Sequence, residues 1–306
     1  MKKVSIITVN FNQPGVTEEL LNSIKTTCKY PNLEIIVVDN GSRENIVPRW
    51  IEKYSHVRFL RSEENLGFAG GNNLGINEAT GDYFFLVNND TEFTPGLVEK
   101  LVDLLDSNPA IGMVSPKIRY YAEKSLIQYA GFTPMDFNTA RNKCVGLMEE
   151  DKGQYDHSTG PTGFAHGAAM MVKKEAIEKA GLMAENFFLY YEEMDWCERI
   201  KQQGYQIWIE PGALIYHKES VSVGKKSALK EFFMNRNRIL FIRRNAPRLS
   251  QLIFYCHFSL LVTPRNIFNY LKEQRPDLIK QLFSSIIWNI TNKKTSKHLG
   301  FPINKI

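Results

Sequence analysis

The sequence has few cysteines, no long apolar run and little net charge, and each shortage excludes a class of protein. The thiols are dispersed and form no Cys-x-x-Cys pair, which argues against a zinc site and fits a reducing compartment; they are Cys28, Cys144, Cys197 and Cys256. No stretch reaches the about 18 apolar residues of a membrane-spanning helix. A net charge of +5 does not by itself indicate nucleic-acid binding.

The chain also lacks the common phosphate-binding and export signals. The Gly-rich segment NLGFAGGNN, residues 65–73, is followed by no Gly-Lys-Ser/Thr and does not have the Gly-x-Gly-x-x-Gly spacing. The N-terminal segment MKKVSIITVNFN has two lysines but only a short, interrupted apolar run. That run is too short for a signal peptide and is typical of a first strand.

The sequence does contain a regular alternation of strand and helix patterns. Its 306 residues are 43% hydrophobic, enough for one large domain with an appendage. Apolar, often β-branched runs predict strands at residues 4–9, 34–38, 57–60, 83–87 and 111–114, and later at 168–172, 205–209 and 213–217. Periodic segments predict helices after Pro14 and at residues 44–54, 71–79 and 95–107. This order predicts an α/β fold with a mostly parallel central sheet flanked by helices.

Polar or Gly-rich clusters follow four of the predicted strands. They are NFN at residues 10–12, DNGS at 39–42, NLGFAGGNN at 65–73 and NND at 88–90. In open α/β sheets, ligands bind beyond the carboxyl ends of the strands, so these clusters are expected to meet at one rim. The oxygen ligands of NND suit Mg²⁺ or Mn²⁺ bridging phosphates, with the substrate completing the coordination.

Each cluster also has an ordinary structural explanation. Asp-Asn-Gly-Ser is turn chemistry, the Gly-rich segment could serve only as a helix entry, and NND could be an acidic loop before the helix that begins near Pro95. The coincidence of four polar strand ends is what favours a ligand site over separate turns.

A second acidic cluster follows an aromatic run in the segment FFLYYEEMDWCERI, residues 187–200. Acids are favoured in the first turn of a helix by the helix dipole, which explains one or two of Glu192, Glu193 and Asp195. The aromatic run would in addition desolvate a carboxylate and raise its basicity, as a general base requires. His217, at the end of an apolar strand, could be structural or a metal ligand.

Taken in order, these motifs resemble the family 2 glycosyltransferases with a GT-A fold, in particular their bacterial rhamnosyltransferase-like branch. The resemblance runs through VNFN, VVDNGS, NLGFAGGNN, NND, GAAMMV, FFLYYEEMDWCERI and His217, and it covers residues 3–245. It implies a Rossmann-like, mostly parallel sheet and a helical C-terminal extension.

The resemblance also implies a role for each motif on the donor side. Asn10 and Asn12 would line the nucleotide site, and Asp39 would accept a hydrogen bond from a pyrimidine ring. The ribose and diphosphate would be held by Asn65, Gly67, Gly70, Asn72 and Asn73. The segment Asn88, Asn89, Asp90 stands where the family has an Asp-x-Asp type motif, with Asp90 as the anionic metal ligand.

On the acceptor side, the family pattern makes Glu193 the catalytic base and His217 a further metal contact. It places His166 near the acceptor and assigns Asp195 to substrate binding. The implied enzyme is an inverting glycosyltransferase that uses Mn²⁺ or Mg²⁺ and transfers a sugar from dTDP-rhamnose or a UDP-sugar. Its acceptor would be a glycan or a polyprenyl-linked molecule in cell-surface polysaccharide synthesis, with no nucleic acid involved.

Two other functions stay open at this point. A nucleotidyltransferase also uses an α/β nucleotide site and a metal, but it normally needs more carboxylates and a basic Gly-rich loop, and VNFNQPG has no Lys or Arg. A non-catalytic nucleotide-sugar-binding protein would not need both Asp90 and Glu193.

The last part of the chain turns helical and basic. We predict a catalytic domain at residues 1–225, with a nucleotide-sugar half at 1–118 and an acceptor half at 119–225, and a C-terminal region at 226–306. Basic residues are interleaved with apolar ones in this region; they include Arg236, Arg238, Arg243, Arg244 and Arg248. Such helices suit an anionic membrane surface, which predicts a cytoplasmic protein bound to the inner face of the membrane. The alternatives are a helical lid or a dimer contact.

Overall fold

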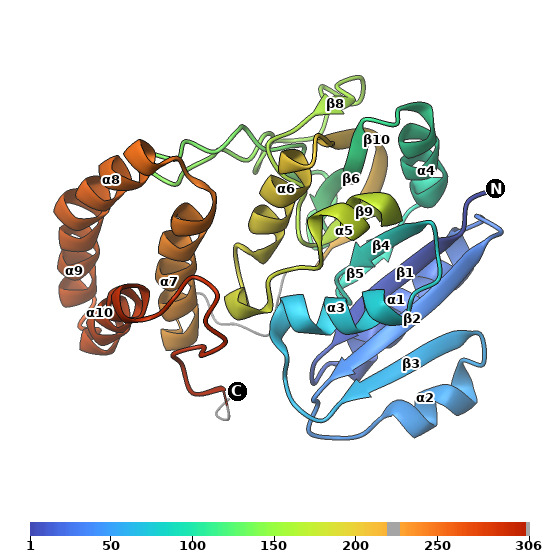
Figure 1. The fold of residues 1–306 in the computed structure, drawn as a ribbon. Helices are drawn as coiled ribbons and strands as arrows, with labels where there is room; N and C mark the ends of the chain where they lie inside the picture. The colour runs from blue at the N-terminus through green and yellow to red at the C-terminus, as the bar shows by residue number, and fades with distance from the viewer. Residues whose placement is uncertain (219–226, 304–306) are drawn as a thin grey trace.

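The computed structural model describes residues 1–218 and 227–303, and within them the strands form one central sheet (Figure 1). The strand order is β3-β2-β1-β4-β9-β6-β10-β5, with β7 paired to β6 and β8 to β10. The strands are β1 (Val4–Asn10), β2 (Leu33–Asn40), β3 (Val57–Ser62), β4 (Tyr83–Val87), β5 (Thr91–Phe93), β6 (Ile111–Tyr120), β7 (Ile127–Tyr129), β8 (Gly160–Pro161), β9 (Ala169–Lys173) and β10 (Gln206–His217).

The first half of the sheet is parallel, as predicted, and the second half is mixed. Strands β1 to β4 pair in parallel, and β10 pairs in parallel with β6. Strand β9 lies antiparallel between β4 and β6, and β5 lies antiparallel against β10. Most of the paired residues belong to the parallel ladders, so the predicted α/β class with a mostly parallel sheet is confirmed.

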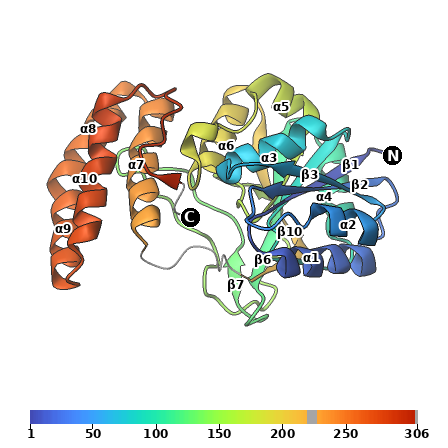
Figure 2. The same ribbon diagram turned by 90° about the horizontal axis from the view of Figure 1, so that it is seen from below.

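Helices cover both faces of this sheet and bury two apolar cores (Figures 1 and 2). One face is covered by α1 (Pro14–Thr27), α2 (Val47–Lys53) and α4 (Leu97–Ser107). The other is covered by α3 (Gly67–Glu78), α5 (Lys174–Ala180) and α6 (Glu192–Gln202), and a short 3₁₀ turn, η1 (Glu185–Phe187), precedes α6.

Two predicted boundaries are wrong. The strands predicted at residues 205–209 and 213–217 are one strand, β10, whose register against β6 shifts between Glu210 and Leu214. The helix predicted from residue 71 begins at Gly67, so most of the expected Gly-rich loop is helical. The early start has a long-range cause: the Phe68 amide donates to the carbonyl of Phe188, 2.7 Å away, which the sequence around α3 does not reveal.

The C-terminal region is helical, as predicted. It consists of α7 (Ala228–Asn245), α8 (Arg248–His257), a π-helical turn η2 (Phe258–Val262), α9 (Thr263–Lys272) and α10 (Pro276–Thr291). Helix α7 packs on α6 and α10, while α8 and α9 form the edge of the molecule farthest from the sheet in both views (Figures 1 and 2). None of the described helices has the length and apolarity needed to cross a bilayer. The predicted boundary at residues 225/226 lies outside the described residues.

Candidate active site

A pocket of about 370 Å³ opens at the carboxyl ends of the parallel strands, where the sequence predicts a ligand site. Eight of the predicted site residues line it, and they are Asn65, Gly67, Asn72, Asn88, Asn89, Asp90, His166 and Glu193. Asn40 and Glu192, which the sequence analysis did not assign as site residues, line it as well. The chain thus brings together side chains from four strand ends and from the start of α6.

Asp90 and His217 face each other beside this pocket. The antiparallel pairing of β5 with β10 sets His217 opposite Thr91, next to Asp90, and the Lys218 amide donates to the Asp90 carbonyl at 2.8 Å. As a result, Asp90 Oδ1 lies 3.1 Å from His217 Nε2, and both side chains are buried. The register of two strands therefore assembles a pair that is 127 residues apart in sequence.

The chemistry of this pair fits a divalent cation. His217 Nδ1 lies 2.8 Å from the side-chain oxygen of Gln128, which can only accept, so in the neutral ring the proton is on Nδ1 and Nε2 presents a lone pair. That lone pair faces Asp90 Oδ1, and neither atom has a hydrogen-bond partner although both are buried. Two facing acceptors without a proton between them are stabilised by a shared cation.

The protein supplies only part of such a coordination shell. Among residues 1–218 and 227–303, no group of three or more His, Cys, Asp or Glu side chains could hold a metal by itself. Asp90 and His217 would hold Mn²⁺ or Mg²⁺ together with ligand oxygens, since Mg²⁺ sites commonly combine one or two carboxylates with substrate phosphates. Gln128 was missed from the sequence because its strand, β7, lies in the irregular stretch between residues 120 and 165.

Glu192 and Glu193 both line the pocket, although their positions on α6 are adjacent. Burial raises the pKa of Glu193 to about 6. Burial and then repulsion from Glu193 raise the pKa of Glu192 well above its usual range, and Glu192 Oε2 has no hydrogen-bond partner. Because repulsion adds to burial at Glu192, Glu193 is the acid of the pair that ionises more readily, which suits Glu193 to accept a proton.

The segment before these two acids has an unusual backbone. Phe188, Tyr190 and Tyr191 have φ angles of 65°, 71° and 71°, a left-handed conformation that non-glycine residues rarely adopt. Each such residue costs on the order of 1–3 kcal/mol, so the surrounding structure must hold the segment in place.

Helix α7 provides that support through two fully buried polar side chains, Arg236 and Asn237. The Asn237 amide donates to the carbonyls of Phe187, Leu189 and Tyr190 at 2.9, 2.7 and 2.9 Å. Arg236 donates to the Phe187 carbonyl at 2.9 Å and to Asn237 Oδ1 at 2.8 Å. The basic and apolar sequence pattern of α7 predicts that Arg236 faces a membrane. That prediction is wrong, because the Arg236 side chain is buried inside the protein.

Asp195 lies outside the pocket. It was predicted to bind substrate, but in the structure it forms hydrogen bonds within the protein. It is fully buried, and its oxygens accept hydrogen bonds from Arg199 at 2.9 Å, Arg244 at 2.7 Å and Asn245 at 2.9 Å. These bonds join α6 to the end of α7. The first turn of α6 therefore carries two pocket acids and one structural acid.

Asn10 and Asp39 are also turned inward. Asp39 is fully buried, accepts a hydrogen bond from Asn10 at 2.9 Å and pairs with Arg61. The Asn10 side-chain oxygen accepts from the Thr17 hydroxyl at 3.0 Å. This network holds the ends of β1, β2 and β3 together, and neither residue lines the pocket. A direct contact between Asp39 and a nucleobase would require Arg61 to move.

Gly70 and Asn73 likewise serve the packing of α3. A Cβ atom on Gly70 would lie 2.7 Å from Leu66 Cβ. Asn73 donates to the carbonyl of Met183 at 2.9 Å and to Glu185 at 3.0 Å, which fixes α3 to the segment before α6. Gly67, in contrast, does lie at the pocket, and a Cβ there would meet the Phe188 carbonyl oxygen at 2.3 Å.

His166 lines the pocket beside Asp90 and Glu193. Its Nδ1 accepts from the Ala168 amide at 3.1 Å, and its ring stacks on Phe132 with centroids 6.1 Å apart. Burial, and to a lesser extent the neighbouring His217, lowers the pKa of His166 to about 3. The ring is therefore neutral, with its proton on Nε2, and can donate one hydrogen bond.

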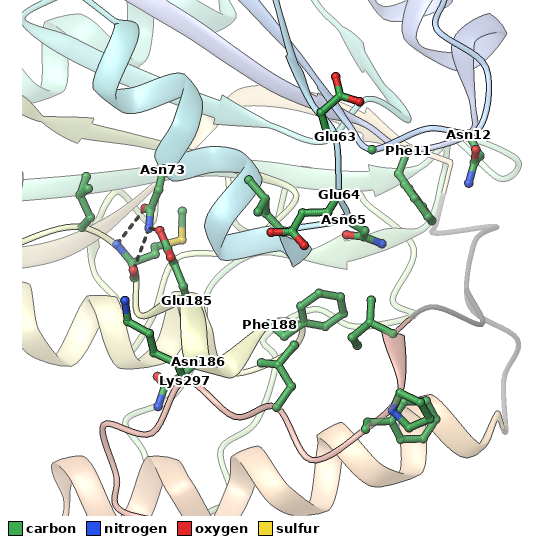
Figure 3. Close-up of a pocket in the computed structure, with 18 of the residues that line it drawn as sticks. Phe11, Asn12, Glu63, Glu64, Asn65, Asn73, Glu185, Asn186, Phe188 and Lys297 are labelled. Atoms are coloured by element: carbon green, nitrogen blue, oxygen red, sulfur yellow. Dashed lines mark hydrogen bonds between the residues drawn. The ribbon is translucent and has the colours of Figure 1, made fainter.

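A second, larger cavity of about 1050 Å³ adjoins the pocket and shares Phe11, Asn65 and Phe188 with it (Figure 3). Asn12 lines this cavity, and Phe188, Asn186 and Lys297 stand across from Phe11 and Asn65. The larger cavity is lined by none of Asp90, His217 and Glu193, whereas Asp90 and Glu193 line the smaller pocket and His217 faces Asp90 beside it.

This sheet, with a carboxylate–histidine pair at its rim and a half-buried glutamate, Glu193, on the facing helix, has the arrangement of a glycosyltransferase of the GT-A fold. Residues 5–181 match the sequence pattern described as "Glycosyl transferase family 2", and the chain belongs to that family.

Similar proteins agree with this assignment. The chain is 24% identical over 298 residues to a "Low-salt glycan biosynthesis hexosyltransferase" of Haloferax volcanii, covering 95% of this chain and 92% of that protein. It is 24% identical over 243 residues to an "N-acetylglucosaminyl-diphospho-decaprenol L-rhamnosyltransferase" of Mycobacterium tuberculosis, covering 73% of this chain and 78% of that protein. A mannosyltransferase of Pyrobaculum calidifontis, solved with GDP-Man and Mn²⁺, shares the fold with a TM-score of 0.56 and 16% identity, covering 95% and 88%.

Proposed function

We propose that the protein is a metal-dependent, inverting glycosyltransferase that transfers a sugar from a nucleoside diphosphate sugar to a hydroxyl of a glycan or lipid-linked acceptor. The observation that carries the proposal is the buried Asp90–His217 pair, whose facing atoms lack hydrogen-bond partners, beside the pocket that Glu193 lines. A diphosphate leaving group needs a bound cation, which the Asp90–His217 pair would hold. Deprotonation of an acceptor hydroxyl needs a carboxylate, which Glu193 would supply.

The donor site extends from the pocket toward the larger cavity. Asn65 and Phe11 line both, and Asn12 lines the larger cavity, so the nucleoside would lie along these residues with its diphosphate directed at Asp90. The bound cation would neutralise charge that develops on the diphosphate. Asn88 and Asn89 offer uncharged polar groups beside it, and Asn89 is held by the Thr17 hydroxyl at 3.0 Å.

The acceptor would enter from the side of His166 and Glu193. Glu193 would accept the proton of the attacking hydroxyl, and neutral His166 would donate a hydrogen bond that orients the acceptor. Attack on the face of the sugar opposite the diphosphate inverts the anomeric centre in one displacement.

The activities named for the similar proteins suggest which substrates to test first. One relative is a rhamnosyltransferase that acts on a decaprenol-linked sugar, which favours dTDP-rhamnose as donor and a polyprenyl-linked acceptor, with UDP-sugars next. Because α7 supports the segment before Glu193, we also propose that the catalytic unit includes α7 and does not stop before it.

The test is a panel of nucleotide-sugars with Mn²⁺, with release of nucleoside diphosphate and free sugar measured without acceptor. Slow hydrolysis of one donor supports a transferase. Release of pyrophosphate from a nucleoside triphosphate would indicate a nucleotidyltransferase, and tight binding without any turnover would indicate a binding protein.

A further inference from the structure

Large apolar side chains stand exposed along the outer helical run formed by α8, η2 and α9, residues 248–272. Six of them are 60% to 72% exposed, and we call them the outer stripe: Leu249, Leu252, Leu260, Leu261, Phe268 and Leu271. An ordinary surface helix presents polar residues to water, so a run that is apolar on its solvent side signals a contact surface.

The opposite side of the same run is apolar too, but it is packed against the protein. Phe254, Phe258, Val262 and Tyr270 recur there at intervals of four or eight residues and are buried. In a regular α-helix, side chains four residues apart differ in direction by about 40°, so both stripes would gradually rotate around the helix axis along the run. The π turn at Phe258–Val262 winds more slowly and offsets this rotation, so the two stripes stay on opposite sides.

The charge around the outer stripe is strongly positive. Residues 246–303 hold eight Lys and Arg against two Asp and Glu, a net charge of +6, whereas the whole chain has +5. On the run itself, Arg248, Arg265 and Lys272 are exposed and flank the stripe. Three of the eight bases therefore flank the exposed apolar side chains, and residues 248–272 contain no Asp or Glu. The other five follow α9 in the chain; Arg275 pairs with Asp277, and Lys297 lines the larger cavity.

Of the five arginines singled out in the sequence, only Arg248 is exposed on the run, whereas the four on α7 make contacts within the protein. Arg236 is buried against the carbonyls before α6, Arg238 donates to the Thr139 carbonyl, and Arg243 donates to Asn289 at 3.1 Å. Arg244 pairs with Asp195. Replacing the α7 arginines would damage the catalytic scaffold and could not test a surface.

We propose that the outer stripe and its flanking bases dock the protein on an anionic lipid bilayer, with the helical run lying in the plane of the interface. Apolar side chains flanked by cations fit the boundary between headgroups and acyl chains, and no described helix spans a membrane. A second copy of the chain fits less well, because each copy would present Arg248, Arg265 and Lys272 with no Asp or Glu in the run, and two such faces would repel each other. The inference rests on the proposed function, since a lipid-linked acceptor would be met at such a surface.

The position of the helical run relative to the pocket is compatible with docking on a bilayer. It lies on the far side of α7 from the sheet (Figures 1 and 2), and α7 itself contributes Leu229 to the pocket. Docking through α8 and α9 would leave the donor rim at the strand ends uncovered. A nucleotide-sugar could then enter from water while the acceptor is presented from the bilayer.

The test uses the full chain and co-flotation with two kinds of vesicle, phosphatidylcholine alone and phosphatidylcholine with phosphatidylglycerol. The test variant is Leu252→Gln/Leu260→Gln/Phe268→Gln. The matched control is Ile51→Gln/Leu147→Gln/Met148→Gln, which removes three apolar side chains of similar exposure far from the run in sequence.

We expect wild type and control to float with the anionic vesicles and the stripe variant to lose at least about tenfold in vesicle partition. Arg265→Gln and Lys272→Gln should each weaken binding to anionic vesicles about fivefold and leave binding to neutral vesicles unchanged. The inference is overturned if wild type stays with the soluble fraction, if the control falls as far as the stripe variant, or if light scattering shows a dimer that only the stripe variant dissociates.

Donor hydrolysis by the same proteins separates this inference from the proposed function. The stripe variant should hydrolyse the donor at the wild-type rate, which also shows that it is folded, since no residue of the stripe lines the pocket or the larger cavity. Hydrolysis without vesicle binding would overturn the docking surface and leave the transferase intact. Vesicle binding with no hydrolysis of any donor would overturn the transferase and leave the surface standing.

Discussion

Replacing Glu193 by Gln should make the protein less active and more stable at the same time. Gln keeps the shape of the side chain and removes its charge, so the variant cannot take a proton from the acceptor. A positioned general base contributes roughly 10²- to 10⁴-fold, and turnover should fall by that order. Donor binding with Mn²⁺ should be unchanged, because the proposed site binds the diphosphate at Asp90 and not at Glu193.

The gain in stability follows from the raised pKa. Burial raises the pKa of Glu193 from 4.5 to about 6, so the folded protein holds this proton more tightly than the unfolded chain does. The cost of the charged form is absent below pH 4.5, grows as the pH rises through that interval and is complete above about pH 6. It amounts to at most about 2 kcal/mol, since one pKa unit is about 1.4 kcal/mol and Glu193 is partly exposed.

Urea unfolding of wild type and Glu193→Gln near about pH 4 and about pH 8 measures this difference. The variant should match wild type at the lower pH and exceed it at the higher pH. Wild-type turnover should decline below about pH 6, as Glu193 becomes protonated. Glu192→Gln is the control: burial and repulsion from Glu193 raise the pKa of Glu192 well above its usual range, so loss of its charge should change turnover and stability less than in Glu193→Gln. If Glu192→Gln abolishes turnover and Glu193→Gln does not, the assignment of the base is wrong.

Two further predictions concern the scaffold of the site. Asn237→Ala removes three hydrogen bonds to the strained segment and should lower the free energy of unfolding by about 2–4 kcal/mol. Turnover should fall more than donor affinity. Equal losses of turnover and donor affinity would place the effect in the donor site. Gly67→Ala puts a Cβ 2.3 Å from the Phe188 carbonyl oxygen at a φ of 71°, so it should displace the start of α3 and weaken donor binding in calorimetry. Unchanged donor affinity in Gly67→Ala would show that this segment does not hold the diphosphate.

The sequence predicts much of this fold because local and global signals agree in its first half. Apolar β-branched runs form the parallel strands, and the polar residues after them gather at one rim, as parallel topology requires. The same argument cannot tell which way a strand-end side chain points. Asp90 and Asn88 face the pocket, whereas Asp39 and Asn10 turn inward and join the strand ends to each other.

The remaining features depend on contacts between distant segments. The partner of His217 is Gln128, from a stretch with no periodicity, and the start of α3 is set by the carbonyl of Phe188. The arginines of α7 look like a membrane-facing pattern until the packing of α7 on α6 shows that Arg236 is internal. An apolar and basic helix has the same sequence signature in both settings, and only tertiary structure separates them.

The most direct test of the central claim is calorimetric binding of dTDP or UDP to wild type, Asp90→Asn and His217→Gln, each with Mn²⁺ and with EDTA. Asp90→Asn keeps the shape of the side chain and removes its charge, and His217→Gln removes the ring nitrogen that faces it. We predict that wild type binds a nucleoside diphosphate tightly only with Mn²⁺ and that both variants lose this metal-dependent part. Equal binding in EDTA, or full Mn²⁺ dependence in both variants, would contradict a metal–diphosphate site at Asp90 and His217.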